Sequence, residues 1–311
     1  MRTWPGPGRE ADSVWKTPSR IAYSTENPGM TAHQFGYQVT PKMKSYSWTK
    51  LLLDRNSRAT EYDDPSLKGT EGDGMLRLPP GKTAEEVVTD YLHEIYNWIF
   101  NMISNRISVE VLAMTPMEFW FTVPAIWSDR AKSATIMAAK NAGFAGRDAD
   151  SIRLIPEPEA AGVATLKGLA EGSSATKINN GDGILICDCG GGTVDITSYR
   201  VIQVRPKLEF EELVEGVGGK CGSTYIDRAF HRWMSATFGR KFDDLSFEKI
   251  GPGSRFMKEF ESFKRDFGYS SSRGPDYSID LETFYEINLV IPRAKDSTHY
   301  DSDESVVKLQ G

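Results

Sequence analysis

The stretch that decides the fold runs from residue 184 to residue 196 and reads Ile184-Leu185-Ile186-Cys187-Asp188-Cys189-Gly190-Gly191-Gly192-Thr193-Val194-Asp195-Ile196. An apolar strand ends in an aspartate, three glycines and a threonine follow, and a second aspartate opens the next strand. This order predicts a tight hairpin whose glycine N–H groups are unshielded and can wrap phosphate oxygens. Asp188 and Asp195, at the ends of adjacent strands, are placed to hold the water shell of Mg²⁺. By itself, a glycine cluster is more typical of an ordinary β-turn with solvated carboxylates.

Further short motifs stand on both sides of this hairpin. Phe121-Thr122-Val123-Pro124-Ala125 and Leu154-Ile155-Pro156-Glu157-Pro158-Glu159-Ala160-Ala161 precede it, and Glu215-Gly216-Val217-Gly218-Gly219 follows it. Glu261-Ser262-Phe263-Lys264-Arg265 then falls on a predicted helix. Read alone, that last segment is as well explained by a solvated charged helix face.

The order VPA, EPxAA, DxGGGTxD and GxGG resembles the nucleotide-binding domain of the heat-shock protein 70 family, within the actin-like ATPase superfamily. Each motif alone is weak, but four in this order at family-like spacing are specific, and the wording is closest to divergent, fungal-type members. The resemblance covers roughly residues 35–290. It implies an α/β, two-lobed actin-like ATPase (ribonuclease H-like) fold, incomplete in this chain, that binds ATP or ADP with Mg²⁺ between its lobes.

The resemblance also implies roles for individual residues. Glu157 would orient the attacking water, and Asp188 and Asp195 would hold Mg²⁺ through water, so that these three and Thr193 form the catalytic set. The nucleotide would be bound by Gly190, Gly191, Gly192, Thr193, Gly218, Gly219, Glu261, Lys264 and Arg265. Of these, Glu261 and Lys264 would contact the ribose, and Arg265 would stack on the purine.

The chain departs from the family pattern in several places. It contains no DxGTTxS phosphate hairpin, and after about Arg293 the match stops, so the resemblance implies a member truncated at both ends. Cys189 replaces an aliphatic residue, and Lys220-Cys221-Gly222 replaces an acidic pair. Lys50 lies in the region of the family's catalytic lysine, but no motif assigns it that role. Because several phosphate-binding donors would be lost together, ATP hydrolysis by this chain is expected to be slow or absent.

The expected domains are a first lobe over residues 1–170, a linker over 171–182, a second lobe over 183–292 and a disordered tail over 293–311. A capping box at Thr83 and Glu86 predicts a helix through Met102, and Ser128 predicts another to Asn141. Strands are predicted over 119–127 and 152–155, a three-strand meander from Ile184 to Leu213, and further strands over 277–281 and 285–291. Helices are expected over 159–169, 223–238 and 254–267.

Composition narrows the possible partners. With 37 basic and 43 acidic residues, the formal net charge is −6, which argues against a dedicated nucleic-acid binder. No apolar run approaches the ~20 residues that span a bilayer, and no secretory signal is visible. The three cysteines form no even disulfide framework, so a cytoplasmic location is expected. Cys187 and Cys189 share a strand face, but too few further ligands stand nearby to predict a zinc site.

Three functions therefore compete. The first is an ATP-binding domain of a heat-shock protein 70-like chaperone, with nucleotide as ligand and co-chaperones or client proteins as partners. The second is a non-catalytic, actin-like protein-interaction module, favoured by the missing DxGTTxS hairpin. The third is another actin-superfamily phosphotransferase, such as a sugar kinase or exopolyphosphatase, which the EPxAA and ExxKR segments disfavour.

Overall fold

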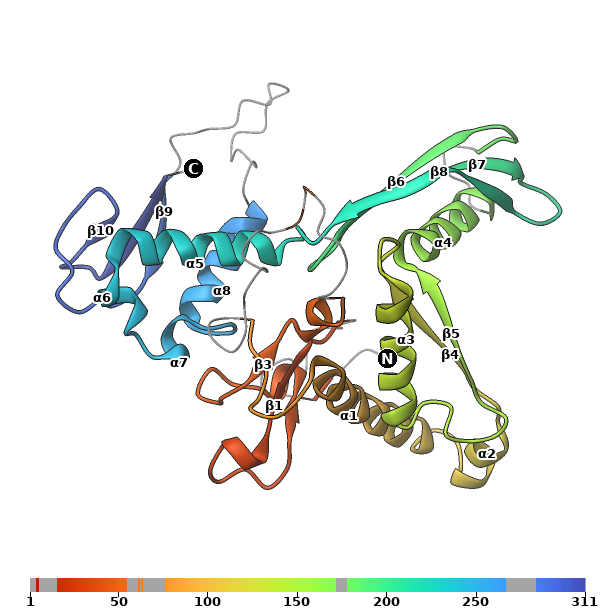
Figure 1. Cartoon of the computed structure of the whole chain (residues 1–311), viewed down its shortest axis with the longest axis horizontal. Helices are drawn as coiled ribbons and strands as arrows, with labels where there is room; N and C mark the ends of the chain where they lie inside the picture. Colours follow the sequence, from red (N-terminus) through yellow and green to blue (C-terminus); the bar gives the residue numbers. More distant parts are fainter. Residues whose placement is uncertain are drawn as a thin grey trace. The chain divides into compact units, whose positions relative to one another are not determined.

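The computed structural model describes residues 4–5, 16–54, 61, 63, 76–171, 178–266 and 284–310. By their internal contacts these residues form two compact units, one made of 1–47 with 227–311 and the other of 48–226 (Figure 1). This division does not coincide with the predicted boundary at 171–182, of which residues 172–177 lie outside the described residues. The two-lobe assignment with that boundary stays a prediction. Within the described residues, no helix is both long and apolar enough to cross a membrane.

The unit of residues 48–226 contains a layer of helices on a short parallel sheet. Its elements are η3 (Thr49–Leu52), α1 (Ala84–Ser104), α2 (Val109–Met114), β4 (Glu118–Val123), α3 (Asp129–Asn141) and β5 (Ser151–Pro156). The predicted capping box is present, because Glu86 N–H donates to the Thr83 hydroxyl and the Glu86 carboxylate accepts from Thr83 N–H. Ser128 caps α3 in the same way through Ala131 N–H. These caps fix where the two helices begin, as the sequence predicted.

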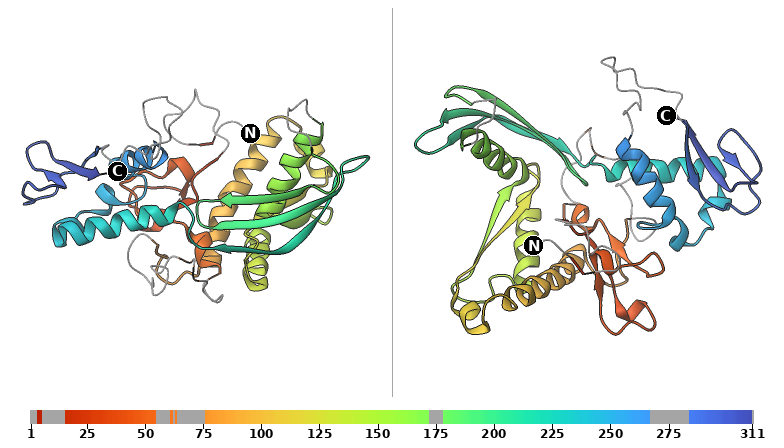
Figure 2. Two further views of the ribbon diagram at one scale, coloured as in Figure 1. Left: turned by 90° about the horizontal axis from the view of Figure 1, so that it is seen from above. Right: turned by 180° about the vertical axis from the view of Figure 1, so that it is seen from behind.

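The helices α1 and α3 lie side by side on one face of β4 and β5 (Figures 1 and 2). Their shared core is built from alanines on α3 and aromatic and branched residues around them: Leu92, Ile95, Tyr96, Phe119, Phe121, Ala139, Ala142, Phe144 and Ile152. Phe144 contacts the rings of Tyr96, Phe119 and Phe121, each at 5.1 Å between centroids. Burial of these groups is the main force that holds this layer together.

The same unit holds an antiparallel meander in the order β6-β7-β8. It consists of β6 (Gly183–Cys189), β7 (Val194–Gln203) and β8 (Glu209–Gly219). The three strands were predicted, but β8 continues beyond the predicted end at Leu213. The helix α4 (Glu157–Glu171) lies under one face of the meander (Figures 1 and 2). A Cβ built on Gly162 of α4 would come within 2.8 Å of Ile186 Cδ1, so α4 and β6 lie in close contact there. The opposite face carries exposed apolar side chains, with Leu185 at 70%, Val214 at 65% and Val217 at 58% exposure.

The second unit has two small sheets and a helical core. Its elements are β1 (Arg20–Ala22), η1 (Ser24–Glu26), β2 (Gln34–Phe35), η2 (Gly36–Gln38), β3 (Tyr46–Ser47), most of α5 (Thr224–Phe238), α6 (Arg240–Asp243), α7 (Phe247–Ile250), α8 (Arg255–Asp266), β9 (Phe284–Asn288), β10 (Tyr300–Asp301) and β11 (Val306–Gln310). The helices α5 and α8 are joined by stacked rings, since Phe230 and Phe260 lie 3.9 Å apart between centroids.

The C-terminal tail corrects one expectation. Residues 293–311 were predicted to be disordered, but β10 and β11 pair with each other, and β11 pairs along its length with β9. Tyr300 and Val307 are buried, and the Tyr300 hydroxyl donates to the Leu289 carbonyl at 3.2 Å. Within the acidic run 301–305, Asp301 ends β10 and residues 302–305 form the turn to β11. The strand predicted over 277–281 lies outside the described residues.

Candidate functional site

The centre of the candidate site is the hairpin between β6 and β7. In its register Asp188 lies directly opposite Asp195, and Cys189 lies opposite Val194. Gly190 N–H donates to the Thr193 carbonyl at 2.9 Å and closes the turn. The two predicted metal-binding carboxylates are therefore cross-strand neighbours, side by side on one face of the sheet.

Asp195 is fully buried, and its environment connects it to the VPA motif. Its Oδ1 accepts hydrogen bonds from Ala125 N–H at 3.0 Å and Ile126 N–H at 3.4 Å. Burial raises the pKa of the Asp195 carboxyl, while the Thr193 side chain and the two N–H groups act in the opposite direction. Among the described residues, its Oδ2 has no hydrogen-bond partner. A buried carboxylate oxygen without a partner fits a cation or its bound water, so Asp188 and Asp195 are suitable to hold Mg²⁺ through water.

The glycine loop is held from behind. The carbonyls of Gly190, Gly191 and Gly192 accept hydrogen bonds from the backbone N–H groups of Ser223, Thr224 and Gly222, at 3.0, 2.9 and 3.1 Å. Within the described residues, the N–H groups of Gly191 and Gly192 take part in no hydrogen bond. The carbonyl oxygens of the loop are therefore already hydrogen-bonded, while two of its N–H groups remain available as donors. A phosphate accepts hydrogen bonds, so it needs such donors.

Glu157 begins α4 and forms an ion pair with Lys50 of η3. The Glu157 side chain is 17% exposed and the Lys50 side chain 48% exposed. Lys50 Nζ also lies 5.5 Å from the ring centroid of Trp127. The next residue, Leu51, contacts the glycine loop, since a Cβ on Gly192 would lie 2.7 Å from Leu51 Cδ2. Through η3, Glu157 is thus linked to the hairpin, and its catalytic role stays a prediction.

No motif assigns Lys50 a role, and the structure pairs it with Glu157. Its partner lies 107 positions away along the chain. No local motif reports an ion pair over that separation. The only sequence signal was the position of Lys50 in the region where the resembling family has its catalytic lysine.

Gly218 and Gly219 end β8 and lie opposite Asp195 and Val194 of β7. A Cβ on Gly218 would lie 2.5 Å from the Val194 carbonyl oxygen, so no side chain fits there. The following residue, Lys220, is buried, and its Nζ lies 3.3 Å from Asp54 Oδ2. Asp54 in turn accepts a hydrogen bond from the Ser128 hydroxyl at 2.6 Å. This buried network fastens the chain beyond η3 to the end of β8.

The predicted adenosine-binding residues lie on α8, in the other unit. Lys264 Nζ contacts Asp227 Oδ1 of α5 at 2.9 Å and Glu261 Oε2 at 2.5 Å, while Arg265 Nε contacts Glu261 Oε1 at 2.8 Å. Lys264 is 11% exposed and Arg265 76% exposed. Burial raises the pKa of Asp227, and the neighbouring Lys264 acts in the opposite direction. The pKa of Lys264 is raised, because its two carboxylate partners outweigh the effect of burial, which lowers it. That α8 and the hairpin share one nucleotide stays a prediction.

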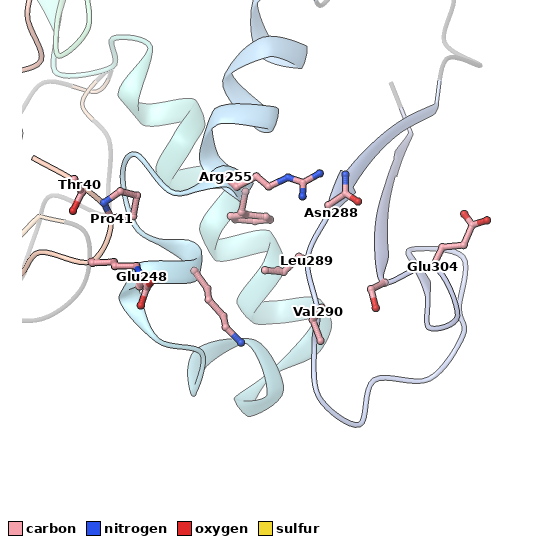
Figure 3. A pocket seen from close by; sticks show the side chains of 12 residues that line it. Thr40, Pro41, Glu248, Arg255, Asn288, Leu289, Val290 and Glu304 are labelled. Atoms are coloured by element: carbon pink, nitrogen blue, oxygen red, sulfur yellow. The ribbon is translucent and has the colours of Figure 1, made fainter. Parts of the chain in front are cut away.

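One cavity in the unit of residues 1–47 and 227–311 lies apart from these motifs. It has a volume of about 730 Å³ and is lined by Pro41, Arg255, Phe256, Leu289 and Val290, among others (Figure 3). Arg255 at its edge pairs with Glu259 at 2.6 Å. None of the predicted site residues lines it, so the cavity adds no support to the nucleotide assignment.

Sequence comparison provides the deciding observation. Residues 95–295, more than half of the chain, match the family model described as Hsp70 protein. The chain belongs to the Hsp70 family. Membership implies the actin-like ATPase fold and nucleotide binding, in agreement with the mixed α/β structure.

Similar curated proteins carry Hsp70 names. Heat shock 70 kDa protein 12A of Homo sapiens is 25% identical over 85% of this chain and 46% of its own length. Heat shock 70 kDa protein 12B of Homo sapiens is 28% identical over 86% of this chain and 46% of its length. Heat shock 70 kDa protein 7, chloroplastic, of Arabidopsis thaliana is 27% identical over 91% and 35%. The Hsp70-family chain thus spans less than half the length of these relatives.

Proposed function

We propose that this Hsp70-family chain binds Mg-ATP and Mg-ADP through the β6–β7 hairpin. The observation that carries the proposal is the glycine loop: three of its carbonyls are held by residues 222–224, while in the described part of the chain the N–H groups of Gly191 and Gly192 make no hydrogen bond. Gly190, Thr193, Gly218 and Gly219 complete the phosphate-binding set. The proposal includes membership in the divergent, fungal-type branch of the family, which the motif sequences resemble most. It also includes a cytoplasmic location.

The roles of the charged residues follow from where they lie. Asp188 and Asp195 would hold Mg²⁺ through water, and the ion would neutralise charge on the phosphates. Glu157 would accept a hydrogen bond from the attacking water and orient it. Lys50, which pairs with Glu157, would place a positive charge beside the terminal phosphate. Positioning and charge stabilisation supply most of the acceleration in phosphoryl transfer, so these four side chains are the ones to test.

On α8, Glu261 and Lys264 are proposed to contact the ribose and Arg265 the purine. The high exposure of Arg265 leaves its guanidinium accessible to a ligand, whereas Lys264 already has two carboxylate partners. Arg265 is therefore the more informative of the two for nucleotide binding.

Hydrolysis by residues 1–311 is proposed to be slow. The sequence contains no DxGTTxS segment to supply further donors to the β- and γ-phosphates. Loss of one preorganised donor commonly costs about 10²–10³ in rate. This observation favours the second candidate function, a non-catalytic, actin-like interaction module whose partners are co-chaperones or client proteins.

The test is a fluorescent-nucleotide titration of the 311-residue chain with Mg²⁺, with phosphate release followed in parallel. Asp188→Ala and Arg265→Ala should each weaken binding by about tenfold or more, by removing an ion-holding or base-stacking group. The matched control is Glu211→Ala, which removes an exposed carboxylate from the neighbouring strand β8. Equal binding by all four proteins would refute the nucleotide assignment. Rapid phosphate release that Asp188→Ala abolishes would refute the non-catalytic module.

A further inference from the structure

Two thiols lie side by side on β6, next to the candidate site but on the other face of the strand. Cys187 and Cys189 flank Asp188, and their Sγ atoms are 3.6 Å apart. Both residues are exposed. Alternate residues of a strand point to opposite faces, so the two thiols point away from the face that carries Asp188.

The two faces of the hairpin offer different donor atoms. The face of Asp188 and Asp195 supplies carboxylate oxygens, and on this side α4 covers Ile186. On the other face, Cys187 lies opposite Ile196 and Cys189 lies opposite Val194. Hard cations such as Mg²⁺ prefer oxygen ligands, while soft cations prefer thiolates. The sulfur face therefore selects a different class of ion from the oxygen face.

The sulfur separation favours chelation over a disulfide. A disulfide needs the two sulfurs about 2.05 Å apart and Cα atoms within about 6.8 Å, whereas alternate Cα atoms of a strand are about 6.6–6.8 Å apart, at the limit of that range. A tetrahedral ion with metal–sulfur bonds of about 2.3 Å places two thiolates about 3.8 Å apart. The observed Sγ–Sγ distance of 3.6 Å is close to the separation in a metal chelate and far from that in a disulfide.

We propose that Cys187 and Cys189 form a two-thiolate chelate for a soft divalent cation of the Zn²⁺ and Cd²⁺ class. Binding replaces two S–H bonds with two metal–sulfur bonds and releases two protons. Water completes the coordination shell, since no group of three or more His, Cys, Asp or Glu side chains in the described ranges could hold a metal. The site is thus a peripheral, exchangeable one rather than a closed structural zinc site, for which four protein ligands are usual.

The test is a Cd²⁺ titration of the reduced 311-residue chain, followed by the ultraviolet thiolate-to-cadmium charge-transfer absorption. The wild-type protein should bind one Cd²⁺ through this pair. Cys187→Ser and Cys189→Ser should each weaken binding by roughly 100-fold, because the chelate is reduced to one thiolate. Since both side chains are exposed, circular dichroism should show that both variants keep the wild-type fold.

Two further variants separate this site from its neighbours. Cys221→Ser removes the remaining thiol of the chain and should leave the Cd²⁺ affinity unchanged. Glu211→Gln removes an exposed carboxylate from β8 and should also leave Cd²⁺ binding unchanged. A Cd²⁺ affinity that is unchanged in Cys187→Ser, or that falls as far in Cys221→Ser as in Cys189→Ser, would overturn the proposal. Failure of nucleotide binding alone would not affect it.

Discussion

Replacing Gly222 with alanine tests how the glycine loop is held. A Cβ at this position would lie 2.6 Å from the Gly192 carbonyl carbon, 2.7 Å from the Gly190 oxygen and 2.7 Å from the Gly191 carbonyl carbon. All three atoms belong to backbone that is already bound by residues 222–224, so no flexible side chain can move aside. The loop and the 222–224 segment must separate, and the three hydrogen bonds between them must lengthen.

The expected cost follows from these contacts. Overpacking of a tight site costs about 1–3 kcal/mol, and weakening three hydrogen bonds adds a fraction of about 1 kcal/mol for each. Reduced freedom of the unfolded chain returns about 0.4–1 kcal/mol. The net loss is about 2 kcal/mol, which corresponds to a melting temperature lower by about 4–8 °C for a domain of this size.

The assay is thermal melting of the nucleotide-free protein, followed by a Mg-ATP titration of the same preparations. Gly191→Ala is the matched control, because nothing lies within 4 Å of a Cβ built there. It should keep the wild-type melting temperature but weaken nucleotide binding, since its new methyl group sits on the proposed phosphate loop. If Gly222→Ala melts within about 1 °C of Gly191→Ala, the contact that we describe between the two segments is wrong.

For three further sets of substitutions, the structure predicts the direction of the change in stability. Burial raises the pKa of Asp195, so its ionisation lowers the stability of the folded protein as the pH rises above about 3.9 and through that raised pKa. The Asp195→Asn variant should therefore have a higher melting temperature than the wild type at neutral pH, and its melting temperature should change less between about pH 4 and pH 8. A lower melting temperature at neutral pH would contradict this. Lys264→Met leaves the buried Asp227 carboxylate without its lysine partner and should lower the free energy of unfolding, measured in urea, by about 3–5 kcal/mol. Arg265→Ala, at an exposed position, should lower it by less than about 0.5 kcal/mol. Equal losses in the two variants would show that the buried pair does not stabilise the protein. Val307→Ala, in strand β11, removes a buried side chain and should lower the free energy of unfolding by about 2 kcal/mol, whereas Val290→Ala, at an exposed position, should leave it almost unchanged. A Val307→Ala protein as stable as the wild type would argue against the packing of the C-terminal strands.

Features set by a few neighbouring residues could be predicted from the sequence. Thr83 with Glu86, and Ser128, marked the starts of α1 and α3, because a cap needs only the chain within three residues of it. The meander was predictable for the same reason, since alternation and the glycine turn define each strand locally. The cross-strand pairing of Asp188 and Asp195 then follows from the length of the turn.

Features that depend on distant partners were not predictable. The pairing of Lys50 with Glu157, and of Asp195 with the backbone of Ala125 and Ile126, joins segments far apart in the sequence. The tail was misjudged because its acidic run dominates its composition. Only Val306, Val307 and Leu309 signalled a strand, and their burial depends on pairing with β9.

The outer face of the β6–β8 sheet has a practical consequence for work with the purified chain. Leu185, Val214 and Val217 are exposed together there, and β6 lies at the edge of the sheet in the described structure. An open strand edge beside an apolar surface lets a second molecule add to the first. Such growth accelerates with concentration and with salts that strengthen apolar association. Dilute, low-salt storage should therefore preserve monomer, and the fraction lost to aggregates will measure how accessible this face is.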